Sequence, residues 1–334
     1  MFMKRIAING FGRIGRLTLR RLLLNPEVQV VAINDLTDIP TLAHLFTYDT
    51  AHRKFQGTVD YNDHALIING QEIKAFMIKD PLQLPWSSLQ IDLVLECTGI
   101  YLSRDTAAAH LTSGAKKVLL SAPPKDESIP THVLGVNDDQ ITDNQTIISN
   151  ASCTTNCLAT VIKVLDDAFG IQFATMNTIH SYTQDQRLQD APHKDLRRAR
   201  AAAQNIIPTS TGAAKAVEAV YPAIKGKLMA SSYRVPIITG SIIELVCKVQ
   251  KPVSRDLVNS TFNAASNNEL KNILEYATAP LVSSDIIGNT HSAIFDSQLT
   301  EVGNEFVKVV AWYDNEAGYS ARFAEMCAKF ANLS

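Results

Sequence analysis

The sequence is poor in cysteine, lacks a long apolar run and carries almost no net charge. Its five cysteines among 334 residues are an odd number without zinc-site spacing, which excludes a disulfide framework. Thirty-one basic and thirty-three acidic side chains leave a net charge of -2, so no positive excess is available for a nucleic-acid backbone. No apolar run approaches the roughly 20 residues that span a bilayer. We therefore expect a cytoplasmic protein without a dedicated nucleic-acid or membrane partner.

The composition is typical of a globular chain with large buried cores, because 46% of the residues are apolar and 19% are charged. A length of 334 residues predicts about two domains. The first ten residues place their charges after the first apolar side chains and contain no long apolar stretch. We expect a first strand there, and no signal peptide.

The N-terminal part alternates between strand and helix patterns. Residues 5–8 and 28–33 are apolar runs typical of buried strands, and leucines recur between them at helical spacing. Further strands are expected at 91–97, 117–121, 133–136 and 146–149. This alternation predicts an α/β domain with a doubly wound, mostly parallel sheet, which binds ligands at the carboxyl ends of its strands. Thr98 and Ser121 lie at such ends.

A glycine motif lies between the first strand and the first helix. Gly10, Gly12 and Gly15 fit the pattern G-x-G-x-x-G, and Asp35 follows 20 residues beyond Gly15. Gly10 allows a tight turn, Gly12 lets the backbone approach a pyrophosphate, and Gly15 lets helix and strand pack closely. The helix N-terminus attracts phosphates. Asp35 suits an adenosine ribose and repels a 2′-phosphate, so we expect NAD in preference to NADP.

The pattern changes after residue 150. Long strand-like runs appear at 173–181, 233–251, 291–302 and 306–314, followed by apolar residues at helical spacing in 318–333. We predict a second, α+β domain with a largely antiparallel sheet. The expected boundaries are 1–151 for the NAD-binding domain, with the helix 317–334 returning to it, and 152–316 for the catalytic domain.

A second dense motif surrounds Cys153. The segment 149–157 ends an expected strand and begins a helix, so Cys153 lies near a helix N-terminus, where the dipole favours the thiolate and lowers the thiol pKa. A metal pair with Cys157 is one alternative, but C-x-x-x-C is uncommon for zinc and no second pair exists. A redox dithiol lacks the usual C-x-x-C. We interpret Cys153 as a nucleophile and Cys157 as a buried structural residue.

A thiol nucleophile requires a base and, for an anionic substrate, cationic partners. His180 lies at the end of the run 175–180, and a buried structural histidine is the alternative for it. Arg234 lies in an apolar stretch and needs either an anionic substrate or a structural carboxylate. The segment 209–215 opens a helix with hydroxyls and a glycine, which suits a phosphate or a simple helix cap. The basic run 194–200 is typical of a solvated face or a subunit contact.

Together these segments resemble the phosphorylating glyceraldehyde-3-phosphate dehydrogenase family. The resemblance covers essentially the whole chain, and the cysteine and His-Ser-Tyr-Thr motifs are highly specific. The motifs that carry it are residues 8–16, 149–157, 180–183, 192–203, 211–215 and 312–316.

The resemblance implies NAD-dependent oxidation of D-glyceraldehyde 3-phosphate to 1,3-bisphosphoglycerate, in glycolysis and gluconeogenesis. Cys153 would form a thiohemiacetal and then a thioester that inorganic phosphate cleaves, and His180 would act as the base. The loop 181–205 matches one that packs against a neighbouring subunit, which implies a homotetramer. No metal is implied.

The resemblance also implies roles for individual residues. Asn315 would meet the nicotinamide amide. The other cofactor positions are Gly10, Gly12, Arg13, Ile14, Gly15, Asp35, Thr98 and Ser121. Thr183 and Arg234 would hold the phosphate of the substrate. The residues expected to hold the attacking phosphate are Ser152, Thr154, Thr211 and Gly212.

The chain departs from the family pattern at three places. Ala317 replaces a tryptophan, the segment 237–240 lacks the usual threonine and asparagine, and Ala191 replaces a leucine at a position that influences NAD against NADP choice. Erythrose-4-phosphate dehydrogenase is an alternative that the segment 98–104 mildly favours, whereas segments 180–183 and 211–215 favour the triose enzyme. An alternative of another class is a non-catalytic NAD-binding interaction protein.

Overall fold

The computed structural model describes residues 3–333, which divide into two compact units. Unit 1 holds the chain up to His132, then Asp138–Ala151 and the residues from Ser320 onward. Unit 2 holds Val133–Asn137 and Ser152–Tyr319. Within residues 3–333, no helix combines the length and the apolar character that crossing a membrane requires.

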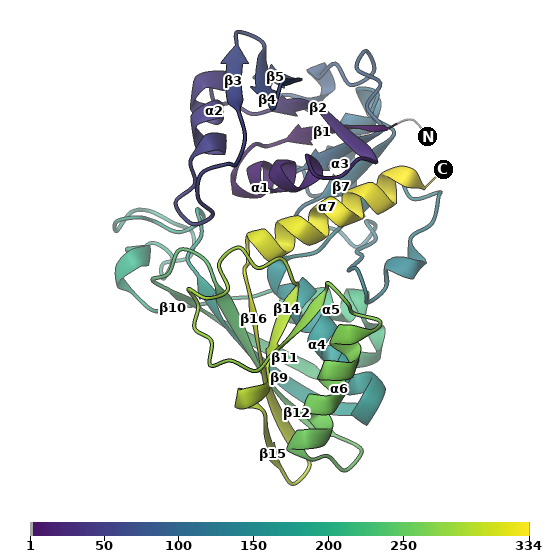
Figure 1. Cartoon of the computed structure of the whole chain (residues 1–334), viewed down its shortest axis with the longest axis vertical. Helices are drawn as coiled ribbons and strands as arrows, with labels where there is room; N and C mark the ends of the chain where they lie inside the picture. The colour runs from purple at the N-terminus through teal and green to yellow at the C-terminus, as the bar shows by residue number, and fades with distance from the viewer. Residues whose placement is uncertain (1–2, 334) are drawn as a thin grey trace. The chain divides into compact units, whose positions relative to one another are not determined.

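Unit 1 is built on an eight-stranded sheet in the order β3-β4-β5-β2-β1-β6-β7-β8. Figure 1 labels β1 to β5 and β7 of this sheet. The strands are β1 Lys4–Asn9, β2 Val28–Asn34, β3 Val59–Asn62, β4 Ala65–Ile68, β5 Gln71–Phe76, β6 Leu93–Glu96, β7 Lys117–Leu120 and β8 Ile147–Ser149. The strands from β5 to β8 along this order pair in parallel, and β3, β4 and β5 form an antiparallel meander. The carboxyl ends of β1, β6 and β7 therefore lie along one edge.

Some helices of unit 1 are capped by a side chain at their N-terminus. The helices are α1 Arg13–Leu22, α2 Ile39–Thr47, α3 Arg104–Thr112 and the main part of α7 Ala317–Asn332. Asp38 caps α2 by accepting the N–H of Thr41, and Ser103 with Thr106 forms a capping box on α3. At the other end of the chain, Lys117 Nζ donates to the carbonyls of Phe330 and Leu333 at 3.0 and 2.8 Å, which holds the last turn of α7 beside β7.

Unit 2 is built on a second sheet in the order β10-β11-β9-β12-β16-β14-β13, with β15 paired to β16. The strands are β9 Ile171–Ser181, β10 Ile207–Thr209, β11 Leu228–Val235, β12 Ser241–Val249, β13 Leu274–Ala277, β14 Ala293–Asp296, β15 Glu301–Gly303 and β16 Phe306–Tyr313. Most neighbours are antiparallel, but β11 pairs with β9 and β13 with β14 in parallel. The predicted fold class is confirmed.

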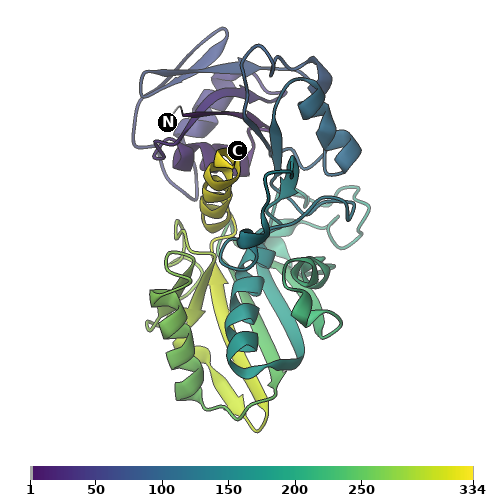
Figure 2. The same ribbon diagram turned by 90° about the vertical axis from the view of Figure 1, so that its right-hand side faces the viewer.

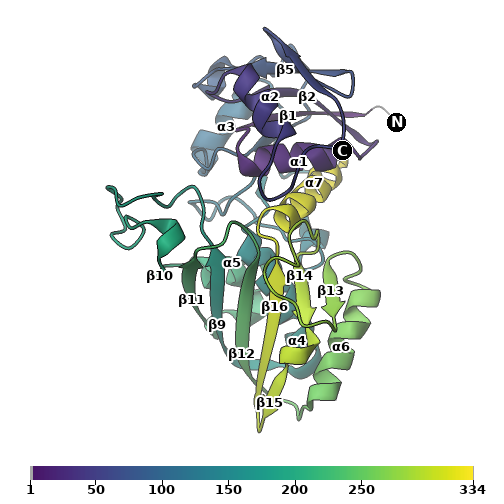
Figure 3. The ribbon, with the colours of Figure 1, turned by 60° about the vertical axis from the view of Figure 1, so that its left-hand side comes forward.

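Helices cover one face of this second sheet. They are α4 Cys153–Phe169, α5 Ala213–Val220 and α6 Arg255–Asn267, and single turns of 3₁₀ helix lie at Pro81–Gln83, Asp138–Gln140, Ala202–Gln204, Pro222–Ile224 and Ser297–Leu299. Figure 2 shows α4 in front of the strands, and Figure 3 shows the strands from the side that carries no helix in the described chain. α4 packs on β9, β12, β14 and β16, so the core of unit 2 lies between this helix and the sheet.

Three expectations about strands were wrong. The run 291–302 is divided into β14 and β15 by the 3₁₀ turn Ser297–Leu299. Residues 133–136 form a turn, in which Asn137 Oδ1 accepts the N–H of Val133 at 2.8 Å and Gly135 has a positive φ of 78°. The run 233–251 is broken after Val235, because Gly240 adopts φ +91° and a Cβ there would lie 2.4 Å from the carbonyl oxygen of Ser283. In addition, the sequence analysis missed the short strands β3 to β5, of which β3 is largely exposed and β4 largely buried.

Candidate active site

Cys153 is the first residue of α4. The N-cap of this helix is Ser152, whose side chain accepts the N–H of Thr155 at 3.1 Å, so the chain turns into the helix at the thiol. Cys153 is only partly buried, whereas Cys157, one turn further along, has no exposed surface. The burial of Cys157 agrees with a structural role, and the position of Cys153 agrees with a reactive one.

The pairing of two strands places His180 and Arg234 side by side. β9 and β11 run parallel, and Arg234 is the register partner of His180. His180 Nε2 lies 3.5 Å from Cys153 Sγ. On the other side of the ring, His180 Nδ1 lies 2.8 Å from the carbonyl oxygen of Ser181 and 2.6 Å from an Arg234 guanidinium nitrogen. The same guanidinium nitrogen donates to the Ser181 carbonyl at 2.9 Å.

These contacts allow two neutral forms of the His180 ring. If Nδ1 donates to the Ser181 carbonyl, Nε2 presents a lone pair to the thiol and acts as a base. If Nδ1 instead accepts from Arg234, Nε2 carries the proton and can donate it to Cys153 Sγ or to an oxygen atom of a ligand bound beside Sγ. Because Nδ1 has both an acceptor and a donor beside it, Nε2 can take up or release a proton without movement of the ring.

The direction of the Cys153 pKa shift differs from our expectation. Desolvation raises the pKa of the Cys153 thiol, and the positive charge of Arg234 and the hydrogen bond with Thr154 offset this only in part. The expected lowering by the helix dipole is therefore wrong for this site: enclosure of the thiol is the larger effect. Burial, followed by repulsion from Arg234, lowers the pKa of His180 to about 3. Both shifts favour the uncharged forms of the pair, a thiol beside a neutral imidazole.

Tyr313 completes this centre, and the sequence analysis did not single it out. Its buried hydroxyl lies 2.9 Å from Thr154 Oγ1 and 3.0 Å from Thr178 Oγ1, and its ring meets the His180 ring edge-on with centroids 5.9 Å apart. Tyr313 therefore supports both the first turn of α4 and the imidazole. Its only sequence signal is its place in the motif 312–316.

The Asn315 side chain is held in one orientation. Its Oδ1 accepts the Ser181 and Ser241 hydroxyls at 2.9 Å each, the Gly240 N–H at 3.2 Å and the Thr239 hydroxyl at 3.3 Å. Because the oxygen is surrounded by donors, the amide nitrogen is the group left to face a ligand. A donor at this position suits the carbonyl of a carboxamide such as that of nicotinamide.

The residues expected at the two phosphate positions divide into two groups. Arg234 Nε is buried and has no hydrogen-bond partner among residues 3–333, and Gly212 begins α5 without a side-chain cap. Both are available to an anion. The other three hydroxyls already have partners within the chain. Ser152 contacts the hydroxyl and the N–H of Thr155. Thr154 contacts the Tyr313 hydroxyl, and Thr211 accepts the Ala213 N–H.

Thr183 and its neighbour Gln186 lie just beyond the end of β9. Gln186 Oε1 accepts the Thr183 N–H at 3.3 Å, which turns the amide nitrogen of Gln186 away. That nitrogen is buried, and it has no partner in the described part of the chain. Gln186 is thus a second buried donor that the sequence analysis missed, because nothing in its spacing marks it.

The glycine turn of unit 1 has the shape that a dinucleotide requires. A Cβ on Gly15 would lie 2.3 Å from the carbonyl oxygen of Gly10, whereas a Cβ on Gly12 would meet no described atom within 4 Å. Gly12 therefore faces open space at the start of α1, which has no side-chain cap and no acidic residue in its first turn. This N-terminus fits a pyrophosphate, and Ile14 lies in the same turn, half-buried.

The remaining cofactor positions lie around that turn. Asp35 follows β2, and its carboxylate accepts the N–H groups of Phe11 and Thr37 at 2.8 and 3.0 Å. Arg13 forms an ion pair with Asp49. Although burial opposes it, hydrogen bonds from His52 and Arg13 hold the pKa of Asp49 well below its ordinary range.

Thr98 and Ser121 follow β6 and β7 at the edge of the sheet where β1 ends. Within residues 3–333 no group of three or more histidine, cysteine, aspartate or glutamate side chains is arranged to hold a metal ion.

Comparisons with known proteins match both units. Residues 4–104 match the family model for the glyceraldehyde 3-phosphate dehydrogenase NAD-binding domain, and residues 152–315 match the model for the C-terminal domain of the same family. The chain is 53% identical over 331 residues to a glyceraldehyde-3-phosphate dehydrogenase of Mycobacterium avium, covering 97% of both chains. It is 54% identical over 326 residues to the Thermotoga maritima protein of that name, covering 97% of this chain and 98% of the relative.

Two glycine substitutions separate folding from cofactor binding. Gly15→Ala places its Cβ against the Gly10 carbonyl, so we expect the free energy of unfolding to fall by about 1–3 kcal/mol. Gly12→Ala has room for its Cβ and leaves unfolding nearly unchanged, but the methyl group narrows the pyrophosphate approach and raises the dissociation constant of NAD. Urea unfolding without NAD and calorimetric NAD titration measure the two effects. Unchanged NAD binding by Gly12→Ala would contradict the assignment.

Removal of the Arg234 charge changes the reactivity of the thiol. Because the guanidinium lowers the pKa of Cys153, Arg234→Gln raises that pKa further and slows alkylation of the thiol at a fixed pH. Arg234→Lys keeps the charge and serves as the control, with a smaller shift. The measurement is the pseudo-first-order rate of reaction with iodoacetamide, at pH values on both sides of the ordinary thiol pKa of about 8.5. Identical pH profiles for the three proteins would show that Arg234 does not act on the thiol.

Proposed function

Because this chain belongs to the glyceraldehyde-3-phosphate dehydrogenase family, we propose that it oxidises D-glyceraldehyde 3-phosphate with NAD and inorganic phosphate to 1,3-bisphosphoglycerate, a reaction of glycolysis. The chain is an NAD-dependent oxidoreductase. The observation that carries the proposal is the contact of Cys153 Sγ with His180 Nε2 at 3.5 Å, with Arg234 bound to the far side of the imidazole. We assign NAD binding to residues 1–151 with the helix 317–334, and catalysis to residues 152–316.

The first step joins the thiol to the aldehyde. Cys153 Sγ bonds to the carbonyl carbon, and the thiol proton passes to His180 Nε2 and from there to the former carbonyl oxygen. The product is a thiohemiacetal on Cys153. Burial lowers the pKa of His180 to about 3, so the imidazole is neutral and Nε2 can take up the thiol proton.

The second step converts the thiohemiacetal to a thioester. His180 takes the proton of the hydroxyl group while the C–H hydrogen leaves the same carbon with both bonding electrons. NAD, when bound, accepts that hydride. Its holders would be the glycine turn 10–15, Asp35, Thr98 and Ser121, with the Asn315 amide nitrogen on the nicotinamide carboxamide.

The third step releases the product. An oxygen of inorganic phosphate attacks the thioester carbonyl, the C–S bond breaks, and Sγ recovers the proton held by His180. The phosphate of the substrate is assigned to Thr183 and Arg234, whose Nε is an unpartnered buried donor within residues 3–333. The attacking phosphate is assigned to Ser152, Thr154, Thr211 and Gly212, around the N-termini of α4 and α5.

We also propose that the enzyme is a cytoplasmic homotetramer. All five cysteines lie within the described residues and are free thiols, which suits a reducing compartment. On the sheet face of unit 2 that carries no described helix, Phe173 and Met229 are 40% and 58% exposed. In the segment 181–206, Leu188, Leu196 and Ile206 are exposed by 70% or more. Apolar side chains gathered in this way are typical of a subunit interface.

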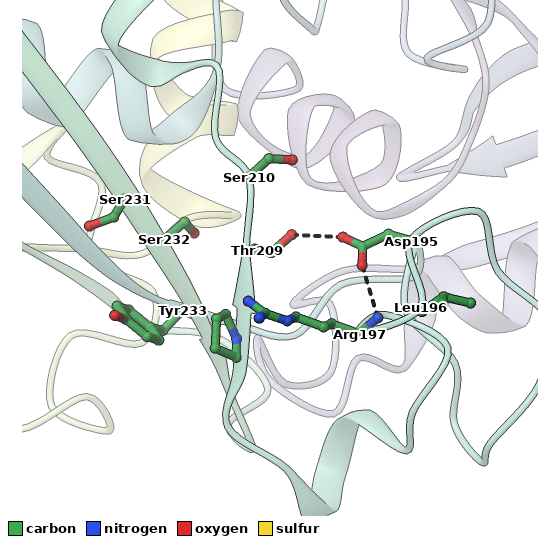
Figure 4. A pocket seen from close by; sticks show the side chains of 9 residues that line it. Asp195, Leu196, Arg197, Thr209, Ser210, Ser231, Ser232 and Tyr233 are labelled. Atoms are coloured by element: carbon green, nitrogen blue, oxygen red, sulfur yellow. Dashed lines mark hydrogen bonds between the residues drawn. The ribbon is translucent and has the colours of Figure 1, made fainter.

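A hollow of about 470 Å³ adjoins these apolar residues (Figure 4). It lies between the loop at Asp195–Arg197, the strand β10 and Ser231–Tyr233 of β11, and the Thr209 hydroxyl bonds to Asp195 at its edge. Two basic side chains of the run 194–200 form ion pairs within the loop, Arg198 with Asp185 and Arg200 with Asp190. The loop is thus braced by its own ion pairs and offers its apolar residues to a second copy of the chain.

The reaction itself is tested by initial rates of NADH formation. We expect fast oxidation of glyceraldehyde 3-phosphate that requires inorganic phosphate, because two anion positions are present. The matched measurement uses erythrose 4-phosphate with and without phosphate. A preference for the tetrose with little phosphate dependence would replace the triose assignment by that of erythrose-4-phosphate dehydrogenase, and would point to the departures at 237–240 and Ala317.

The oligomeric state is tested by light scattering. We expect the mass of four chains of 36.6 kDa for the wild type, and smaller species for Met229→Asp and Leu196→Asp, because a buried charge without a partner opposes association. Leu24→Asp is the control: this side chain is 76% exposed and lies in unit 1, between α1 and β2. A monomeric wild type would overturn the proposal.

A further inference from the structure

A fully buried carboxylate lies behind the glycine turn of unit 1. Glu96 ends β6 and has no exposed surface. Its Oε2 accepts Asn9 Nδ2 at 2.6 Å and His110 Nε2 at 3.0 Å, and its Oε1 accepts the Thr98 N–H at 2.7 Å and the Thr98 hydroxyl. Four donors of the described chain thus meet two oxygens, which is the coordination of an acceptor-only carboxylate.

The His110 ring cannot reverse its role toward Glu96. The indole N–H of Trp86 donates to His110 Nδ1 at 3.1 Å, and an indole nitrogen has no lone pair to offer in return. His110 Nδ1 is therefore unprotonated, and the ring proton is on Nε2, where it faces Glu96. Both Trp86 and His110 are fully buried, so within the described residues the indole is the group that sets this tautomer.

The Asn9 amide is fixed by a similar chain of contacts. The backbone N–H of Ile78 donates to Asn34 Oδ1, and Asn34 Nδ2 donates to the Ile78 carbonyl, each at 2.9 Å. Asn34 Nδ2 also donates to Asn9 Oδ1 at 2.7 Å. Asn9 Nδ2 is thereby turned toward Glu96, and reversing it would set two NH₂ groups against each other.

We propose that Glu96 is a positioning residue for NAD: its carboxylate joins the residue before the glycine turn to Thr98 and so sets the shape of the cofactor edge. Asn9 precedes Gly10, and a Cβ on Gly10 would lie 2.7 Å from the Thr98 backbone nitrogen and 2.9 Å from its methyl group. The glycine turn and the end of β6 are therefore in contact, and Glu96 bonds to a residue of each, Asn9 and Thr98. This inference rests on the NAD-dependent function proposed above.

The same contacts refine the role of Thr98. Its N–H and its hydroxyl proton are both given to Glu96, and its hydroxyl oxygen accepts the Ile100 N–H at 3.1 Å. What Thr98 has left for a cofactor is its carbonyl and its methyl group. Thr98 thus acts on NAD through its position, which Glu96 sets.

Glu96→Gln tests the proposal. An amide presents one oxygen and one NH₂ group, so in either orientation its NH₂ meets donors that cannot reverse. Relief requires Asn9 or Thr98 to move, and we expect the dissociation constant of NAD, measured by calorimetric titration, to rise roughly tenfold or more. Glu72→Gln is the matched control, because Glu72 is an exposed carboxylate on β5 of the same unit. A Glu96→Gln dissociation constant equal to that of the control would overturn the proposal.

A second substitution tests the tautomer argument and separates positioning from simple destabilisation. Trp86→Phe removes the donor to His110 Nδ1, so the ring proton can move there and Nε2 can accept from the amide of Glu96→Gln and from Asn9 Nδ2, 3.4 Å away. We expect Trp86→Phe to tighten NAD binding in the Glu96→Gln background. The loss of the indole lowers the melting temperature both of the Trp86→Phe single variant and of the double variant. Weaker binding by the double variant would contradict the argument.

Two further measurements keep the test decisive. Should Glu96→Gln fail to fold, Thr98→Val keeps the shape of the side chain but removes one donor to Glu96 and the acceptor of the Ile100 N–H. We expect a severalfold rise in the NAD dissociation constant. An unchanged value for Thr98→Val would then count against the proposal. If the wild-type protein itself does not bind NAD, the proposed function fails; if it binds and the variants bind equally well, only this inference fails.

Discussion

The catalytic centre depends on the register between β9 and β11. Because the strands are parallel and Arg234 pairs with His180, the guanidinium reaches both the imidazole and the Ser181 carbonyl beside it. A shift of one residue would turn Arg234 to the other face of the sheet and leave Nδ1 with the carbonyl alone. The register is kept by the neighbouring pairing of β9 with β12, which continues antiparallel over most of the strand. The positions of His180 and Arg234 are thus fixed by the most extensive strand pairings of this sheet.

Burial and charge act on this centre in opposite directions for the thiol and in the same direction for the imidazole. Enclosure disfavours both charged forms, so it raises the pKa of Cys153 and lowers that of His180. Arg234 stabilises a thiolate but repels an imidazolium. The arrangement therefore favours the uncharged forms of both groups, with Arg234 ready to stabilise a thiolate when it forms. Each of the three proposed steps moves one proton to or from Nε2.

Local features of the chain were predictable from the sequence, and features set by distant contacts were not. The glycine turn, the helix start at Cys153 and the strand end at His180 are encoded by adjacent residues, and the structure has all three. Our expectation for the direction of the Cys153 pKa shift was wrong. A helix N-terminus can be predicted from a short segment of sequence, whereas desolvation depends on which residues surround the thiol in the fold. Tyr313 contacts Thr154 and Thr178 across 159 and 135 residues of sequence, so its place in the motif 312–316 could not reveal these contacts.

The departure at residues 237–240 shows how a site tolerates a change of sequence. Asn315 is oriented by donors that converge on its oxygen, as Glu96 is in unit 1, and such a constraint depends on where hydrogen atoms point more than on which side chains carry them. The Gly240 N–H belongs to the backbone, and the Ser181 and Ser241 hydroxyls lie outside the altered segment. Thr239 adds a hydroxyl that also bonds to Asp314, the residue before Asn315. A segment that differs from the family pattern therefore still supplies donors that hold the Asn315 amide, which we propose faces the nicotinamide.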